Sequence, residues 1–247
     1  YWLSLTALSP YQKELMGYVL ILHEVAMVAA DTTRTKYYLN ELIRNGLIPN
    51  YVLVLFNASK ELLPGQKEAV GENELVSLLI RHGVKYGLAT SSDINSEKVV
   101  LELSVRPENV FIFSGYGGVL LKDNLLNIEK KFLHIHGGYL PDYKGSTTNY
   151  YSLINENTIG ASAIFLTKEI DCGPILLRKK FPPPADRKEI DHKYDAEVRA
   201  SVLIECVQNY VDKGEWICEL SNNNGGETFY IIHPVLKHLA IMREREL

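Results

Sequence analysis

Cysteine is scarce in this chain, and its few residues do not follow the spacing of a metal site or of paired disulfides. Cys172, Cys206 and Cys218 are an odd number in 247 residues, and no Cys-x-x-Cys pair occurs. This pattern argues against a disulfide framework, and we expect a cytoplasmic protein.

A long apolar run is also missing. The longest such stretch near the start, YVLILHEVAMVAA, is too short to cross a bilayer and carries His23 and Glu24 in its middle. We therefore expect it to be buried in a core, with no membrane partner.

The chain lacks the excess of basic residues with which proteins hold nucleic-acid backbones. It has 26 Lys and Arg against 30 Asp and Glu, which gives a formal net charge of -4. We therefore expect no nucleic acid among the partners, and a small molecule instead.

What the sequence does contain is an alternation of strand-like and helix-like segments, without internal repeats. Apolar runs at 24–31, 51–57, 85–90, 109–115 and 130–136 are separated by helical patterns at 33–46, 72–83, 95–105 and 120–126. Alternation of this kind predicts an α/β fold with a Rossmann-like, mostly parallel sheet and flanking helices.

The second half departs from this alternation. A helix over 147–157 precedes two β runs, 159–167 and 173–181, which we expect to form an antiparallel hairpin at the sheet edge. Three prolines at 182–184 then break the pattern. Beyond them we expect a helix over 195–214, a strand over 227–233 and a helix over 234–246. We therefore predict an N-terminal extension (1–24), a catalytic domain (25–187) and a small α+β C-terminal extension (188–247).

Two histidines stand at the carboxyl end of the predicted strand 130–136, where open parallel sheets bind ligands. His134 and His136 are two residues apart, so their side chains share one face of the strand. Asp171, in the turn between the late β runs, could accept the ring N–H of His136 and orient it for acid–base chemistry. Two other interpretations stay open: solvated strand-end histidines with an aspartate turn, or a metal site built on all three residues.

A second candidate site lies where the first predicted strand meets the first helix. Thr32, Thr33 and Arg34 could hold a phosphate or carboxylate of the substrate at the helix N-terminus. The threonines could equally be helix caps, and Arg34 a surface residue.

The stretch HIHGGYLPDYKG, followed later by EIDCGPILL, resembles the folate-dependent formyltransferases, which include the glycinamide ribonucleotide, methionyl-tRNA and nucleotide-sugar enzymes. That family shows Asn-x-His-x-x-x-Leu-Pro, a pair of aromatic or basic residues with Gly, and later Asp-x-Gly-x-Ile. The resemblance covers roughly residues 25–181, includes SGYGGVLL, and rests on residues in the same order: His136, Leu140, Pro141, Tyr143, Lys144, Gly145, Asp171, Gly173 and Ile175.

The resemblance implies transfer of a formyl group from N10-formyltetrahydrofolate to a primary amine, without a metal. His136 would accept and donate the proton, and Asp171 would orient it. His134 stands where the family has an asparagine that donates to the formyl oxygen; losing such a donor costs about 3 kcal/mol of transition-state stabilisation. A histidine can donate as well.

The resemblance also implies binding residues. The folate would lie against backbone groups of two loops, Gly117, Gly118, Val119 and Leu120 in one and Thr167, Lys168 and Glu169 in the other. The acceptor amine would lie against the segment from Tyr143 to Tyr151, which includes Tyr143, Lys144, Thr148 and Asn149. The glycines could instead belong to an ordinary turn, and the tyrosines could pack in a core.

The first choice of acceptor is a nucleotide-linked amino sugar, followed by an amino acid such as a hydroxyornithine-type amine. From the 60 residues that follow position 187 in this sequence, we expect no tRNA-binding barrel like that of the methionyl-tRNA enzymes. A hydrolase, a metal-dependent enzyme and an inert binding module on the same fold are the alternatives, and the sequence leaves a homodimer open.

Overall fold

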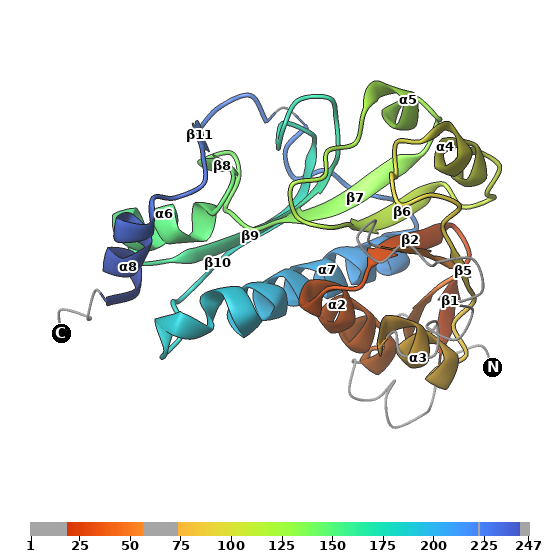
Figure 1. Ribbon diagram of the computed structural model, residues 1–247, viewed down its shortest axis with the longest axis horizontal. Helices are drawn as coiled ribbons and strands as arrows, with labels where there is room; N and C mark the ends of the chain where they lie inside the picture. The colour runs from red at the N-terminus through yellow and green to blue at the C-terminus, as the bar shows by residue number, and fades with distance from the viewer. Residues whose placement is uncertain (1–18, 57–73, 222, 243–247) are drawn as a thin grey trace. The chain divides into compact units, whose positions relative to one another are not determined.

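The computed structural model describes residues 19–56, 74–221 and 223–242 (Figure 1). The chain forms two compact units, residues 1–133 and 134–247. Most of the N-terminal extension expected over 1–24 lies outside the described residues.

The first unit contains the parallel strands that the sequence predicts. In sheet order they are β7, β6, β2, β4 and β5, and each strand is parallel to its neighbours in this order. Their bounds are β2 Val25–Ala30, β4 Val52–Leu55, β5 Tyr86–Leu88, β6 Val110–Ser114 and β7 Lys131–His136. The intervening helices are α2 Thr33–Arg44, α3 Glu74–Arg81, α4 Glu97–Ser104 and α5 Asp123–Leu126.

Burial explains why these apolar runs become central strands. All six residues of β2 are fully buried, as expected of a strand that is covered on both faces. Each Val or Met side chain buried in this way contributes about 1.5–3 kcal/mol. The helix that follows is set by a cap, because the hydroxyl of Thr32 accepts a hydrogen bond from the backbone N–H of Thr35 at 3.2 Å. The helix ends at Arg44, Asn45 is its C-cap, and the next residue, Gly46, has a left-handed φ of 68°.

The second unit begins within β7 at His134 and contains the predicted hairpin. β9 Ile159–Phe165 lies next to β7, and β10 Ile175–Phe181 pairs with β9 in antiparallel orientation at the sheet edge. The long helix α7 Asp195–Lys213 packs on both hairpin strands, and α8 Pro234–Met242 packs beside α6 Thr148–Glu156 (Figure 1). A 3-10 turn, Arg187–Glu189, and a π-helical turn, Ile190–Tyr194, lead into α7.

Several very short strands are absent from the predictions. These are β1 Leu20–Leu22, β3 Leu47–Pro49 and β8 Tyr143–Gly145. β1 pairs with β3, and β8 pairs with β11 Glu227–Phe229, which lies within the strand predicted over 227–233; both pairs are parallel. The second pair matters for the site, because it brings the C-terminal segment against the sequence that follows β7.

The predicted α/β class with a mostly parallel sheet and flanking helices is confirmed. The domain boundary expected at residue 187 stays a prediction. Among the residues that the structure describes, no helix combines the length and the apolar character that a membrane crossing requires.

Candidate functional site

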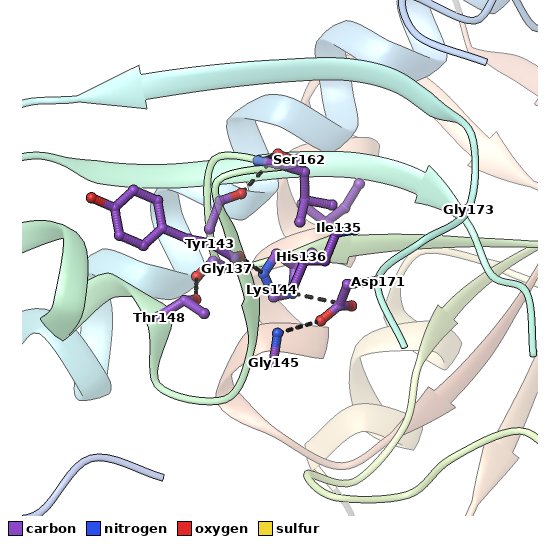
Figure 2. Close-up of polar contacts among 12 residues, drawn as sticks. Ile135, His136, Gly137, Tyr143, Lys144, Gly145, Thr148, Ser162, Asp171 and Gly173 are labelled. Atoms are coloured by element: carbon purple, nitrogen blue, oxygen red, sulfur yellow. Dashed lines mark hydrogen bonds and ion pairs between the residues drawn. The ribbon is translucent and has the colours of Figure 1, made fainter. Parts of the chain in front are cut away.

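His136, the last residue of β7, is held on both sides of its ring. The side chain is buried, with 5% of the residue exposed. Its Nε2 lies 2.8 Å from the carbonyl oxygen of Tyr143, and its Nδ1 lies 3.3 Å from Oδ1 of Asp171 (Figure 2). The expected meeting of this imidazole with the carboxylate from the hairpin turn is therefore present.

Asp171 reaches the histidine from a strained turn between β9 and β10. Its φ is 54°, in the left-handed region. The turn also requires Gly173, because a Cβ at that position would overlap the carbonyl oxygen of Phe165. The second carboxylate oxygen, Oδ2, accepts a hydrogen bond from the backbone N–H of Gly145 at 2.8 Å (Figure 2). Both oxygens of this buried carboxylate thus have fixed partners.

The surroundings of Asp171 keep it ionised. Burial alone would raise its pKa, but the charge and hydrogen bond of His136 and the amide of Gly145 outweigh burial and lower the pKa to about 2. A smaller lowering comes from His134. The carboxylate is therefore a permanent negative charge at neutral pH.

The hydrogen-bonding capacity of its ring determines how His136 can satisfy its two contacts. A carbonyl oxygen and an ionised carboxylate only accept hydrogen bonds, so the protonated ring, which donates from both nitrogens, satisfies both contacts. The neutral ring satisfies one. The site therefore holds an imidazole that is oriented at both ring nitrogens beside a fixed negative charge.

The turn after β7 is clamped by buried polar side chains. The hydroxyl of Ser162 on β9 donates to the carbonyl oxygen of Gly138 at 2.7 Å and accepts from the N–H of Leu140 at 3.0 Å. Thr148 donates to the carbonyl oxygen of Gly137 (Figure 2). Gly138 has no room for a side chain, because a Cβ there would meet His136, Thr148 and the carbonyl oxygen of Tyr143. These contacts fix the backbone that holds His136.

Behind the Asp171 turn lies a buried cluster that we did not predict. Lys144 is 3% exposed, and its Nζ donates to the carbonyl oxygen of Asn223 at 2.5 Å and contacts Sγ of Cys172 at 3.3 Å. Asn223 is 1% exposed, and its Nδ2 donates to the carbonyl oxygens of Asp171 at 2.6 Å and Gly173 at 3.2 Å. The loop before β11 thus supports the turn that carries the carboxylate.

Most of the residues predicted to bind the acceptor are internal. Tyr143 donates its hydroxyl hydrogen to Glu156 at 2.9 Å, and Thr148 belongs to the clamp described above. Asn149 donates to Asp195 at 2.9 Å. With Lys144, these residues have 2–5% of their surface exposed and use polar atoms for contacts within the second unit. Their contact with substrate stays a prediction.

The predicted folate loops are exposed where the structure describes them. Thr167, Lys168 and Glu169 are exposed and lead directly to Asp171. In the first unit, Gly117, Gly118, Val119 and Leu120 are exposed, and a Cβ built at either glycine meets nothing within 4 Å. Both loops can therefore be reached from solvent.

At the predicted anion site, Thr32 has the capping role that the sequence left open. Thr32 is the N-cap of α2, while Thr33 is exposed at the first helical position. Arg34 donates from Nη2 to the carbonyl oxygen of Gly115 at 2.6 Å and from Nε to Ser114 at 3.4 Å. Binding of an anion by these residues stays a prediction.

The metal interpretation gains no support from the side-chain arrangement. Within the described ranges, His, Cys, Asp and Glu side chains do not gather in any group of three or more that could hold a metal ion. His134 lies half-buried two residues before His136 on β7.

The sequence that forms this site is similar to a known protein family. A model of the formyl transferase family matches residues 24–207, well over half of the sequence, and the match contains both His136 and Asp171. The chain belongs to this family.

Relatives with similar sequences match this chain over only part of their own length. Methionyl-tRNA formyltransferase from a Nitratiruptor species is 25% identical over 135 residues, which cover 54% of this chain and 44% of that protein. Formyltetrahydrofolate deformylase 1, mitochondrial, from Arabidopsis thaliana is 30% identical over 111 residues, which cover 44% and 34%. The chain thus spans less than half the length of either relative.

The fold extends further than the sequence likeness. The X-ray structure of a sugar N-formyltransferase from Shewanella sp FDAARGOS_354 is 15% identical, with a TM-score of 0.54, and the match covers 88% of this chain and 86% of that one. At this identity the likeness supports the fold.

The sequence points to His136 and Asp171 but not to the side chains that support them. Ser162 lies on the apolar strand β9, and Arg199 lies on α7, outside the residues that the sequence motif contains. Arg199 donates to the carbonyl oxygen of Ile135 at 3.0 Å and pairs with Asp195 at 2.8 Å. A serine within an otherwise apolar strand was the one available signal, since a buried hydroxyl needs a partner.

Proposed function

We propose that this protein transfers a formyl group from N10-formyltetrahydrofolate to the primary amine of a small molecule. The observation that carries the proposal is the buried His136–Asp171 pair at the end of β7, within the family match. An ionised carboxylate beside an imidazole, on a clamped backbone, suits acyl transfer to an amine, in which a proton must be taken up and returned.

The position of one exposed loop suits the binding of a folate. The loop of Thr167, Lys168 and Glu169 is exposed and runs straight into Asp171, so a ligand held by its backbone would present its reactive end to the pair. When bound, the folate supplies the formyl carbon. Binding by this loop and by Gly117, Gly118, Val119 and Leu120 is part of the proposal.

The roles of the chain's residues follow from their contacts. As the amine nitrogen bonds to the formyl carbon, negative charge develops on the formyl oxygen, and His134 donates a hydrogen bond to it. His136 exchanges its Nε2 contact with Tyr143 for one with the substrate while Asp171 retains Nδ1. The proton lost by the amine passes through His136 to the folate nitrogen as the carbon–nitrogen bond breaks. Catalytic contacts commonly tighten in this way when substrate binds.

The acceptor proposed first is a nucleotide-linked amino sugar. The solved structure of a sugar N-formyltransferase shares the fold over most of both chains, which supports the choice. The formal charge of -4 favours a small molecule over nucleic acid. An amino acid with a side-chain amine is the next choice. Thr32, Thr33 and Arg34 would then hold the phosphate or carboxylate of the acceptor.

A hydrolase that releases formate is the second candidate, because the chain is 30% identical over 111 residues to a protein named formyltetrahydrofolate deformylase. The two activities differ in whether an amine is consumed. A hydrolase needs water at the position that the amine would occupy.

One assay separates the two functions. The purified protein is incubated with N10-formyltetrahydrofolate, alone and with a panel of nucleotide amino sugars and amino acids, while formate and formylated amine are measured. Formyl transfer predicts a formylated amine and little formate without an acceptor. Equal formate release with and without amines would favour the hydrolase. His136→Asn is the control, and it should abolish either product.

A further inference from the structure

Lys144 and Cys172 place an amine and a thiol in direct contact. The Nζ of Lys144 lies 3.3 Å from Sγ of Cys172. Lys144 comes from β8 and Cys172 from the hairpin turn, so the contact joins two separate segments of the second unit. It does not belong to the contacts of His136, and the proposed function assigns it no part.

The surroundings of this contact are unusual for a lysine. Only 3% of Lys144 is exposed, and none of the described carboxylates lies within 4.0 Å of its Nζ. Its other hydrogen-bond partner is the carbonyl oxygen of Asn223. Burying an amine without a counter-charge costs free energy. The sulfur of Cys172 is therefore one of the two polar contacts that offset this cost.

Cys172 differs from the other cysteines in being both partly exposed and paired with an amine. Cys206 is 4% exposed, and burial raises the pKa of its thiol to about 12, which makes it inert. Cys218 is exposed, and within the described ranges neither of these two cysteines forms a hydrogen bond with a lysine nitrogen. Cys172 is partly exposed as a residue, between the buried Cys206 and the exposed Cys218. Reactive cysteines typically lie in such partly exposed, electropositive surroundings.

We propose that oxidation by dioxygen joins Lys144 and Cys172 through a single oxygen atom, as an N–O–S cross-link. The nitrogen gives up one hydrogen and the sulfur gives up one. One oxygen atom of dioxygen is inserted between them, and the other leaves as water with both hydrogens. Nitrogen and sulfur are oxidised and dioxygen is reduced. Two equivalents of a dithiol reverse the step and return the amine, the thiol and a second water.

The cross-link would act on the backbone that holds Asp171. Cys172 follows Asp171 directly, and Lys144 precedes Gly145, whose N–H donates to the carboxylate. A covalent link between these neighbours ties together the two segments that position the carboxylate. The inference is independent of the proposed function, because it rests on the reduced contact alone.

Intact mass measurement tests the cross-link. The reduced protein is exposed to oxygen-saturated buffer, and we expect a gain of about 14 Da, one oxygen gained and two hydrogens lost, that a dithiol removes. Proteolysis should then give one peptide pair joining residues 144 and 172. Cys172→Ser should show no such gain, and Cys218→Ser should show the same gain as the parent.

Other outcomes would overturn the proposal. These are an unchanged mass, oxygen atoms added to Cys172 without a joined peptide, and a reversible gain of about 14 Da that persists in Cys172→Ser. Lys144→Arg keeps a cation at this position but removes the amine, and it should prevent the cross-link. If that buried substitution does not fold, the Cys172→Ser comparison still decides.

Discussion

Oδ1 of Asp171 lies 3.3 Å from Nδ1 of His136, and Oδ2 of the same carboxylate accepts the N–H of Gly145. One carboxylate therefore fixes both the imidazole and the backbone of β8. Changes at Asp171 should affect chemistry and local structure together, and the first two predictions separate these effects.

Asp171→Asn should reduce formyl transfer by about 10⁴-fold if the proposed function holds, because a neutral amide no longer supports the protonated imidazole. Steady-state rates at neutral pH measure this, together with an unfolding curve that shows the variant to be folded. The matched control is the exposed Asp142→Asn, for which we expect the parental rate. A folded Asp171→Asn variant with full activity would remove this carboxylate from the mechanism.

The stability of the protein should depend on Asp171 in acid. Its pKa is lowered from the ordinary value of 3.8 to about 2 in the folded chain. A lowered folded pKa stabilises the fold above the unfolded pKa, and this contribution is lost as pH falls from about 4 towards 2. The free energy of unfolding, measured by urea titration across this range, should fall more steeply for the parent than for Asp171→Asn. Parallel curves would contradict the assignment.

His134→Asn should leave formyl transfer within about tenfold of the parent, since an amide can donate to the formyl oxygen as an imidazole does. His134→Ala removes the donor and should cost about 10²–10³-fold in kcat. The pair of variants is compared in kcat and KM with the same acceptor. Equal loss in both would mean that the imidazole does something an amide cannot do.

Ser162→Ala should destabilise the protein by about 1–3 kcal/mol, because it leaves two buried backbone partners, Gly138 and Leu140, without their hydrogen bonds. The free energy of unfolding from urea titration measures this loss. The control is Ser201→Ala on the exposed face of α7, where a change within about 0.5 kcal/mol is expected. Equal effects of the two substitutions would argue against the clamp.

Asn223→Ala should loosen the turn of Asp171, since its side chain donates to two carbonyl oxygens there. We expect a loss of about 1–3 kcal/mol in unfolding free energy. We also expect a fall in kcat with KM little changed, and a hydrogen-exchange measurement should show faster exchange at residues 171–173. Asn224→Ala, an exposed neighbour, is the control. Unchanged hydrogen exchange in Asn223→Ala would show that the turn is stable without the hydrogen bonds of this side chain.

The elements of the fold were predictable because their apolar patterns are long. β2 and β6 are continuous, largely apolar runs of at least five residues, and α7 is long enough for a helical period, so burial leaves a recognisable pattern in each. β1, β3 and β8 have three residues each, too few for a period, and their pairing depends on contacts distant in sequence. The predicted strand over 227–233 shortened to Glu227–Phe229 for the same reason, since only these residues pair with β8.

The candidate site was predictable in part for a related reason. His136 and Asp171 belong to a spaced motif, so the sequence points to them. Asn223 lies in a polar loop that resembles ordinary surface, and Lys144 follows a motif tyrosine as though it faced a ligand. Their burial arises from the pairing of β8 with β11, which joins segments that no sequence pattern connects.

The pairing of β8 with β11 also limits how far the chain can be truncated at its C-terminal end without loss of function. The family match ends at residue 207, yet Asn223 and the strand Glu227–Phe229 lie beyond it. A fragment trimmed to the matched residues would keep the imidazole and the carboxylate but lose the loop that supports them. Any expression design should therefore retain the chain through at least residue 232, where the backbone N–H of Ile232 still donates to Thr147.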